Sequence, residues 1–215
     1  MAQIKRDIFK HDPDHPVILH RKEIINKKGV FGVLRDPAIC QIFDDRLIQF
    51  LTDTDYAVIT AVIDKKAMMA KEYWSQKHPY HYLMEILVEK YTQWLERKSS
   101  TGDIMPEMRR GKKDQALQRA FFTVRTFGTY FVKPDRIAAR LPAKHLKFRS
   151  KAENITGLQI CDLIAHPSHI HVRALQKHPV TLGPFGARVV PILTATKYDR
   201  SYWGRISGYG IKYLP

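Results

Sequence analysis

The feature of this sequence that most constrains its fold is one carboxylate within an apolar segment. Residues 154–165 predict a short helix that is hydrophobic on nearly every side and should therefore be buried. Asp162 lies in the middle of this segment. Burial of an ionised carboxylate is costly unless a cation, hydrogen bonds or a metal ion compensates for it. The fold must therefore place a compensating group opposite Asp162, and a divalent metal ion is a strong candidate.

Two residues that precede this helix offer another explanation. Lys151 could form a buried salt bridge with Asp162, in place of a metal ion. Asn154 could support either arrangement, or it could be the N-cap of the helix or a turn residue before Gly157. The residues alone leave these alternatives open.

The charge of the chain points to a polyanionic partner. The 215 residues contain 36 lysines and arginines against 21 aspartates and glutamates, which gives a net charge of +15. A domain this basic usually binds nucleic acid. A merely well-solvated surface is the alternative, because net charge by itself is not specific.

The hydrophobic fraction of 44% suits one folded domain, or one domain with an appendage.

Cysteine usage and hydropathy predict the compartment. Cys40 and Cys161 lie in apolar helical patterns, and their spacing matches neither a zinc site nor a disulfide framework. We expect both to be small core residues in a reducing cytoplasm. No run of about 18 apolar residues predicts a membrane span, and no apolar segment near Met1 predicts a secretory signal. The sequence therefore predicts a cytoplasmic protein without membrane association.

Apolar periodicity predicts alternating helices and strands. Helical spacing of hydrophobic residues predicts long helices at 37–52, 80–97 and 112–127. The first of these should begin after Asp36, an N-cap that precedes a proline. Apolar or β-branched runs predict a buried strand at 56–63 and shorter strands at 103–108 and 146–148. This alternation is typical of an α/β fold with a partly parallel sheet.

The C-terminal part differs in character from the rest of the chain. Prolines and glycines interrupt residues 167–215, and no long periodic element is evident there. We therefore expect one domain at residues 1–166, with residues 167–215 as an irregular extension packed on it.

Three acidic residues come from separate predicted elements. Asp64 and Glu107 each lie at or near the end of a predicted strand, and Asp162 lies in the apolar helix. In α/β folds, groups at the carboxyl ends of strands line the functional crevice. Carboxylates that converge there repel each other unless cations neutralise them, and such hard oxygen ligands suit Mg²⁺ or Mn²⁺. Two such ions can hold the attacking and leaving oxygens of a phosphodiester.

The first two of these acids also have structural interpretations. Asp64 could pair with Lys65 or with another nearby cation. Glu107 could be a surface partner of Arg109 or Arg110. Asp162 is the strongest of the three candidates, because its surroundings are the least tolerant of a charge.

The ten histidines give a weaker signal. Those at 78–81 and 166–171 lack the spacing of a zinc site, and we expect them at the surface, where they could contact phosphate. His169 and His171 are two residues apart, which would place them on one face of a strand, but the proline and the loop composition of this segment argue against a strand. The sequence contains no glycine-rich phosphate loop and no nucleophile elbow.

Aromatic residues near cations offer a possible contact with nucleic acid. These are Tyr73, Trp74, Tyr198, Tyr202 and Trp203. Such rings can stack on unpaired bases, although packing inside the protein is the more frequent role of aromatic residues.

The residues around Asp162 carry a resemblance. The pattern Lys151-x-x-Asn154-x-x-Gly157-Leu158-Gln159-x-x-Asp162-Leu163-Ile164-Ala165 resembles the hallmark near the end of the domain-of-unknown-function family 3800. Other segments agree with that family less specifically, namely residues 17–31, Val62-Ile63-Asp64-Lys65, Glu107-Met108-Arg109 and residues 208–215. The resemblance covers nearly the whole chain, and the hallmark helix carries most of its specificity.

The resemblance implies a fold and a set of acids. The family is widespread in bacteria and phages, and its expected architecture is a ribonuclease H-like mixed sheet flanked by helices. Asp64, Glu107 and Asp162 would then be the acids grouped for two metal ions. Family members usually open with a strand that carries Asp-Glu-Ser-Gly, and this sequence has no such strand. We therefore expect the first strand of the sheet to be missing, because Asp12 and Asp14 are poor replacements.

Three functional hypotheses follow. The first is a metal-dependent nuclease or related phosphoryl-transfer enzyme, with Asp64, Glu107 and Asp162 as metal ligands. In this hypothesis the phosphates are contacted by Lys65, Arg109, Lys151 and Asn154. The second is a catalytically inactive relative that binds nucleic acid, and the third is a structural or partner-binding protein.

Overall fold

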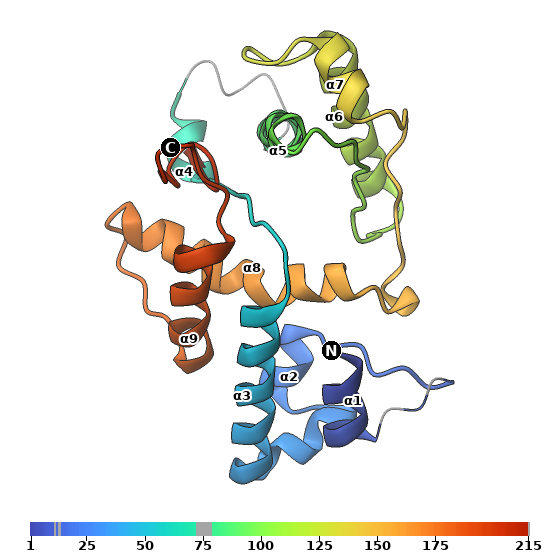
Figure 1. Ribbon diagram of the computed structural model, residues 1–215, viewed down its shortest axis with the longest axis vertical. Coiled ribbons are helices and arrows are strands. Elements are labelled where there is room, and N and C mark those ends of the chain that lie inside the picture. The colour runs from blue at the N-terminus through green and yellow to red at the C-terminus, as the bar shows by residue number, and fades with distance from the viewer. Residues whose placement is uncertain (11, 13, 72–78, 215) are drawn as a thin grey trace. The chain divides into compact units, whose positions relative to one another are not determined.

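The computed structural model describes residues 1–10, 12, 14–71 and 79–214 (Figure 1). Within these residues the chain is mainly helical, with one small parallel sheet of two strands, so the expected α/β class is confirmed. The chain forms two compact units, and each is built from two separate stretches of sequence. The first unit is Met1–Ala57 with Lys151–Lys197, and the second is Val58–Ser150 with Tyr198–Pro215.

The first unit is helical. Its elements are α1 (Ala2–Phe9), α2 (Arg21–Asn26), the 3₁₀ helix η1 (Gly29–Arg35), α3 (Pro37–Asp53), the 3₁₀ turn η3 (Lys151–Glu153), α8 (Thr156–Leu175), α9 (Pro184–Ile192) and the π-helical turn η4 (Leu193–Lys197). In its core the Phe9 ring meets the rings of Phe31 and Phe43 edge-on, with centroid distances of 5.1 and 5.3 Å. Such contacts stabilise the core beyond the burial of apolar area alone.

The start of α3 follows from its sequence. The Asp36 carboxylate accepts hydrogen bonds from the backbone N–H groups of Ala38 (2.8 Å) and Ile39 (3.3 Å). Pro37 occupies the first helical position. A backbone N–H at this position has no intrahelical acceptor, so proline, which lacks the N–H, costs the helix no hydrogen bond. The predicted helix at 37–52 and its N-cap are therefore confirmed.

The second unit combines helices with the sheet. Its elements are β1 (Thr60–Ile63), α4 (Lys65–Met69), α5 (Pro79–Arg97), α6 (Lys112–Phe127), α7 (Pro134–Arg140) and β2 (Ile211–Leu214). Strand β1 pairs in parallel with β2, so that Thr60 lies opposite Ile211. The predicted helices at 80–97 and 112–127 are confirmed, and the predicted strand at 56–63 is confirmed over its second half.

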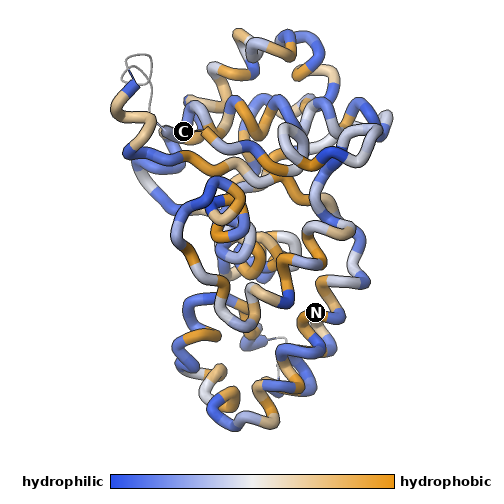
Figure 2. The backbone as a smooth tube through the Cα atoms, turned by 90° about the vertical axis from the view of Figure 1, so that its left-hand side faces the viewer, coloured by the Kyte–Doolittle hydropathy of each residue, from blue (hydrophilic) through white to orange (hydrophobic). Residues whose placement is uncertain are grey.

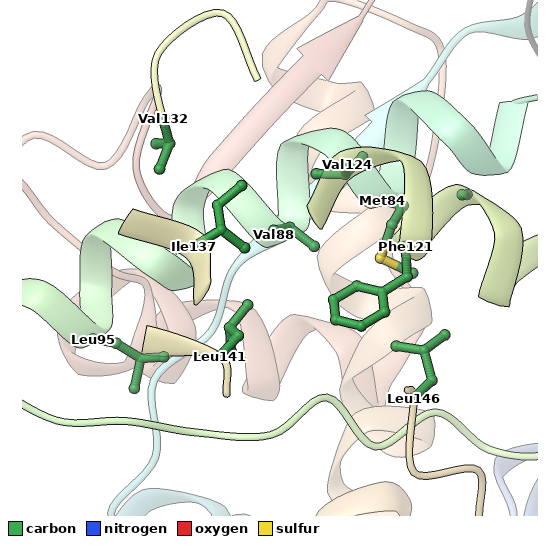
Figure 3. Packing of buried hydrophobic residues seen from close by; sticks show 10 residues of the cluster. Met84, Val88, Leu95, Phe121, Val124, Val132, Ile137, Leu141 and Leu146 are labelled. Carbon is green, nitrogen blue, oxygen red and sulfur yellow. The ribbon is translucent and has the colours of Figure 1, made fainter. Parts of the chain in front are cut away.

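The core of the second unit lies among α5, α6 and α7. Side chains from all three helices point toward one another (Figure 3). Those labelled from the helices include Met84, Val88, Phe121, Val124 and Ile137, none of them more than 4% exposed. Hydrophobic and hydrophilic residues alternate along the helices (Figure 2), as amphipathic helices require.

The two shorter predicted strands are wrong as regular strands, although their segments do pair. Glu107 forms an isolated parallel bridge with Arg149. Around it, Lys147 N donates to Ile104 O (3.0 Å) and Arg149 N donates to Pro106 O (3.1 Å). A parallel ladder would next place a bond from the N–H of residue 106 to Lys147 O. Pro106 has no N–H, so the ladder is interrupted there.

Residues 167–215 contain regular helices and a strand, and the expectation of an irregular extension is wrong. Helix α8 continues through Pro167 to Leu175. A proline removes one intrahelical hydrogen bond, but the buried positions on α8 keep helical spacing on both sides of it. They are Gln159, Ile160, Leu163, Ile164, Pro167, Ser168 and Val172. The predicted boundary between residues 166 and 167 therefore falls inside one helix.

Candidate functional site

Asp162 lies on a partly exposed face of α8. Its side chain is 33% exposed, whereas Ile160, Leu163 and Ile164 beside it are buried. Cys161, which we expected in the core, is exposed. The prediction of a helix buried on every side is therefore wrong, because the buried stripe covers one side of α8 and Asp162 lies at its edge.

Two side chains of α8 hold the segment that leads into α2. Asp162 Oδ2 accepts a hydrogen bond from Arg21 N (2.8 Å), and Gln159 Oε1 accepts one from Leu19 N (2.8 Å). Residues three apart on a helix share a face, and alternate residues of an extended segment also share one. The spacing of the two acceptors therefore matches the spacing of the two donors. His20 Nε2 lies 3.9 Å from Asp162 Oδ1 and adds a second neighbour.

Asn154 is a turn residue whose side-chain oxygen accepts hydrogen bonds from two other side chains. Its φ of 54° is left-handed, a conformation that asparagine adopts more readily than most residues. Its Oδ1 accepts hydrogen bonds from Lys5 Nζ (2.7 Å) and Gln159 Nε2 (3.0 Å). The turn interpretation of Asn154 is therefore confirmed, and its contact with a phosphate stays a prediction.

Lys5 is a buried cation that the sequence did not single out. It is only 3% exposed, and burial lowers the pKa of its ammonium group to about 8. The one sequence signal was indirect, since Ile4, Ile8 and Phe9 suggest a helical turn with a buried side. Burial of the lysine depends on the fold as a whole, which supplies Asn154 as acceptor.

Lys151 pairs with a different acid from the one we considered. Its Nζ lies 3.8 Å from Glu23 Oε1, and both side chains are partly exposed. The alternative of a buried Lys151–Asp162 salt bridge is therefore wrong. Asp162 receives its compensation from the backbone N–H of Arg21.

Asp64 caps a helix. It directly follows β1, and its Oδ1 accepts hydrogen bonds from the backbone N–H groups of Lys66 and Ala67, both at 3.0 Å. Its Oδ2 accepts a hydrogen bond from Tyr213 Oη at 3.3 Å. Carboxylates are favoured at helix N-termini for this reason. The neighbouring Lys65 is exposed at the first position of α4.

Glu107 and Arg109 lie where the paired segment leads into α6. The half-buried Glu107 takes part in the bridge to Arg149. The backbone N–H groups of Arg109 and Arg110 donate to the Asp114 carboxylate at 2.9 and 2.8 Å. This anchors the backbone of both arginines and leaves their side chains exposed.

The three predicted acids belong to different units. Asp64 and Glu107 are in the second unit, and Asp162 is in the first. Among the residues that the structure describes, no group of three or more histidine, cysteine, aspartate or glutamate side chains is arranged to hold a metal ion. A carboxylate that accepts backbone hydrogen bonds keeps further lone pairs, and these could still bind a metal ion. The shared Mg²⁺ or Mn²⁺ site of these acids therefore stays a prediction.

The histidines of α8 are not arranged as a strand would arrange them. His169 and His171 lie within the helix and therefore do not share a strand face. Residues two apart on a helix point in nearly opposite directions. Burial lowers the pKa of both imidazoles, which are therefore mostly neutral at pH 7. Neutral rings have no net charge with which to attract a phosphate.

The aromatic candidates separate into two kinds. Tyr198 is 2% exposed and is a packing residue. Tyr202 and Trp203 are 91% and 88% exposed, and their rings meet edge-on with centroids 5.0 Å apart. Tyr73 and Trp74 lie outside the described residues.

The first unit also contains an apolar cavity of about 320 Å³. Phe43 and Leu163 contribute to its wall, and Arg21 and Asp44 are charged residues that line it. The Arg21 guanidinium lies 5.7 Å from the centroid of the Phe185 ring. Burial raises the pKa of the Asp44 carboxyl group. Sequence analysis did not reveal this cavity because its walls come from distant segments.

No family model matches the chain, and no curated protein or solved structure matches it either. The resemblance to family 3800 therefore depends on the quoted residues alone. None of the helices in the described part of the chain is both long and apolar enough to cross a membrane.

Proposed function

We propose that this protein binds nucleic acid and that residues 109–149 of the second unit make the main contact. The observation that supports this proposal is the uneven distribution of positive charge along the chain. This segment contains twelve lysines and arginines against two aspartates, which accounts for ten of the fifteen excess positive charges of the chain. A surface that is only well solvated would spread its charge more evenly. A concentrated basic segment binds phosphates and releases their counterions.

Some of these cations have partners within the unit, and others do not. Arg136 pairs with Glu96 at 2.6 Å, and Lys147 pairs with Asp103 at 2.5 Å. Five exposed cations make no ion pair with another described residue, namely Lys112, Lys113, Arg119, Lys133 and Lys144. Since none of the acids in the described part of the chain pairs with them, these side chains are suited to phosphate oxygens.

Salt-dependent binding tests this proposal. Fluorescence anisotropy with labelled DNA and RNA oligonucleotides, from low to moderate salt, gives the affinity and its salt slope. Replacing Lys113, Lys133 and Lys144 together by glutamine should lower the affinity at least tenfold. The salt slope should fall by about two, because each phosphate contact contributes about 0.7 to 0.9.

The matched control removes the same charge elsewhere. Lys22, Lys28 and Lys177 are exposed in the first unit, and their triple replacement by glutamine should change the affinity less than threefold. Equal losses for the two triple variants would mean that only the net charge matters. Absence of binding to any oligonucleotide at low salt would overturn the proposal and leave a structural or partner-binding role.

A second candidate function is metal-dependent cleavage of the bound nucleic acid. Asp64 and Glu107 each lie at the carboxyl end of a parallel-paired segment of the same unit, the position where α/β proteins place functional groups. Asp162, which belongs to the first unit, is the third acid that the resemblance to family 3800 implies. These carboxylates suit Mg²⁺ or Mn²⁺, which would activate a water molecule and stabilise the charge that develops on the phosphate. Lys65, Arg109, Lys151 and Asn154 would bind phosphate oxygens.

Asp64 offers a clean test of cleavage. Asparagine caps helices about as well as aspartate, so Asp64→Asn should preserve α4 while it weakens metal binding. Cleavage of oligonucleotides with added Mg²⁺ or Mn²⁺ should fall at least a hundredfold in this variant and in Glu107→Gln, with unchanged affinity for the oligonucleotide. The control is Asp53→Asn, which should cleave normally. Full activity in both acid variants would reject these ligands.

A ribonuclease H-like architecture belongs to the same proposal. Its support is limited to the parallel pairing of β1 and the acid that directly follows it. This architecture would require further strands beside β1, in addition to the two-stranded sheet of the described residues.

A further inference from the structure

Four aromatic side chains of the second unit are exposed within a stretch of ten residues. Phe122 is 60% exposed, Phe127 77%, Tyr130 90% and Phe131 65%. The adjacent Phe121 is only 2% exposed and lies in the core (Figure 3). Burial of a large apolar side chain is favourable by a few kcal/mol, so a group of exposed rings is a common sign of a binding surface.

One of these rings, Phe122, lines a cleft in the same unit. Helices α6 and α7 lie side by side (Figure 1), and with residues 144–145 they form a cleft of about 490 Å³. Phe122 contributes an aromatic face to its wall, and Arg125 and Lys144 contribute positive charge. The volume falls within the range of sites that hold small organic groups. The turn that carries Tyr130 and Phe131 leads directly into α7.

One cation in the cleft wall has an unused donor. Arg125 Nη2 donates to Pro142 O at 3.2 Å, while Nη1 is buried and has no hydrogen-bond partner among the described residues. A buried charged donor without an acceptor is costly. An anion bound in the cleft would supply an acceptor for this guanidinium. Asp135 also lines the cleft, but its charge is outweighed by Arg125 and Lys144.

The combination of flat rings and cations indicates the class of ligand. Every nucleobase has a π-face that stacks on an aromatic side chain, and the phosphates beside it bind lysine and arginine. In a duplex the base faces are stacked on each other and are not available to a side chain. An acidic protein partner would satisfy the cations but has no need for four exposed rings.

We infer that the α6–α7 cleft and its exposed rings bind unpaired nucleotides, so that the protein selects single-stranded over double-stranded nucleic acid. Phe122 stacks on one base within the cleft while Arg125 and Lys144 bind its phosphate. Phe127, Tyr130 and Phe131 stack on neighbouring bases. This inference rests on the proposed nucleic-acid binding and specifies its substrate.

The test replaces rings by leucine, which keeps apolar volume but removes the π-face. Phe122→Leu and Tyr130→Leu should each weaken binding of a single-stranded oligothymidine or oligouridine about tenfold. Affinity for a duplex of the same length should change less than twofold. Met69→Ala, at an exposed apolar side chain of the same unit that has no π-face, should leave single-strand binding unchanged, and Trp203→Leu is made for comparison. Circular dichroism verifies that each variant is folded.

A second measurement does not depend on affinity. Photocrosslinking with 5-iodouracil, placed in DNA and in RNA oligonucleotides, should label residues 122–131, and the two arms show which sugar is preferred. Wild-type affinity in both ring variants, or a duplex bound as tightly as the single strand, would overturn the inference and leave the basic segment as a general polyanion site. Loss of binding in Trp203→Leu alone would assign the stacking surface to that ring. A protein that binds no nucleic acid would reject the proposed function itself.

Discussion

The carboxylate of Asp162 accepts a hydrogen bond from the backbone N–H of Arg21 across 2.8 Å, over 141 residues of sequence separation. Arg21 begins α2, whose first N–H groups have no intrahelical acceptor. Asp162 therefore satisfies a helix terminus and fixes the N-terminal segment to α8. A residue that the sequence marks as a metal ligand thus has a demonstrable structural contact, and the two roles can be separated by substitution.

The effect of an Asp162 substitution on stability should depend on whether the new side chain keeps a hydrogen-bond acceptor for Arg21 N. Asp162→Ala removes the acceptor for Arg21 N and should lower the free energy of unfolding by about 1–3 kcal/mol. Asp162→Asn keeps an oxygen acceptor and should cost less than about 1 kcal/mol. Urea denaturation followed by circular dichroism measures both. Equal stability of the alanine variant and the wild type would show that the contact contributes nothing.

The buried Lys5 should make stability rise with pH. Because burial lowers its pKa to about 8 from 10.5, the unfolded chain binds more protons than the folded protein between these values. The free energy of unfolding should therefore increase from pH 8 to pH 10, by about 2 kcal/mol. Lys5→Met should remove that increase. Equal pH profiles for the variant and the wild type would contradict this origin.

The sequence predicted those elements that depend on residues close together in the chain better than those that depend on distant contacts. Apolar spacing sufficed for α3, α5 and α6, because each helix buries one stripe whose period is visible in the sequence. It failed for α8, where Pro167 suggested an end although the buried stripe continues beyond it. For residues 103–108 the sequence predicted a strand that Pro106 should shorten or confine to an edge, whereas the segment forms only the isolated bridge at Glu107.

The candidate site was less predictable than the fold because side-chain contacts depend on distant segments. The hallmark pattern around Asp162 identified residues that do interact, but composition could not show that their partners are the backbone N–H groups of Leu19 and Arg21. Lys5 carries no motif at all. The exposure of Phe122 beside the buried Phe121 depends on how α6 packs against its neighbours.

Asp44 and Asp45 are adjacent on α3 and should respond to pH in opposite ways. Burial raises the pKa of Asp44, so its ionisation opposes folding at neutral pH, and this cost disappears as the pH falls toward 3.8. Hydrogen bonds from Gln41 and Arg188 lower the pKa of Asp45, which then favours folding at neutral pH.

Asparagine substitutions at the two positions test this contrast. Asp44→Asn should raise the midpoint of thermal unfolding at pH 7, and the gain should shrink as the pH approaches 4. Asp45→Asn should lower the midpoint at pH 7. Scanning calorimetry at several pH values follows both variants, and a destabilised Asp44→Asn would mean that the carboxylate has a favourable partner in solution.

Gly210 is the position where an added methyl group should be least tolerated. A Cβ atom there would lie 2.6 Å from Asp199 O and 2.7 Å from Asp199 N, and both are backbone atoms that cannot turn aside. Gly210 O also accepts the hydrogen bond from Thr60 N at 2.8 Å, next to the first pair of β1 and β2. Gly210→Ala should therefore loosen the sheet and destabilise the protein by about 1–3 kcal/mol.

Gly183 supplies the control for this substitution. It has a φ of −69°, and a Cβ atom there would meet nothing within 4 Å. Gly183→Ala should change the free energy of unfolding only slightly, because the restriction of the unfolded chain by alanine offsets the loss of glycine at the N-cap of α9. Amide hydrogen exchange should show faster exchange at Thr60 in Gly210→Ala and no change there in Gly183→Ala. Equal protection of Thr60 in both variants would mean that the strands adjust to the methyl group and that the close approach of Gly210 to Asp199 is not required for their pairing.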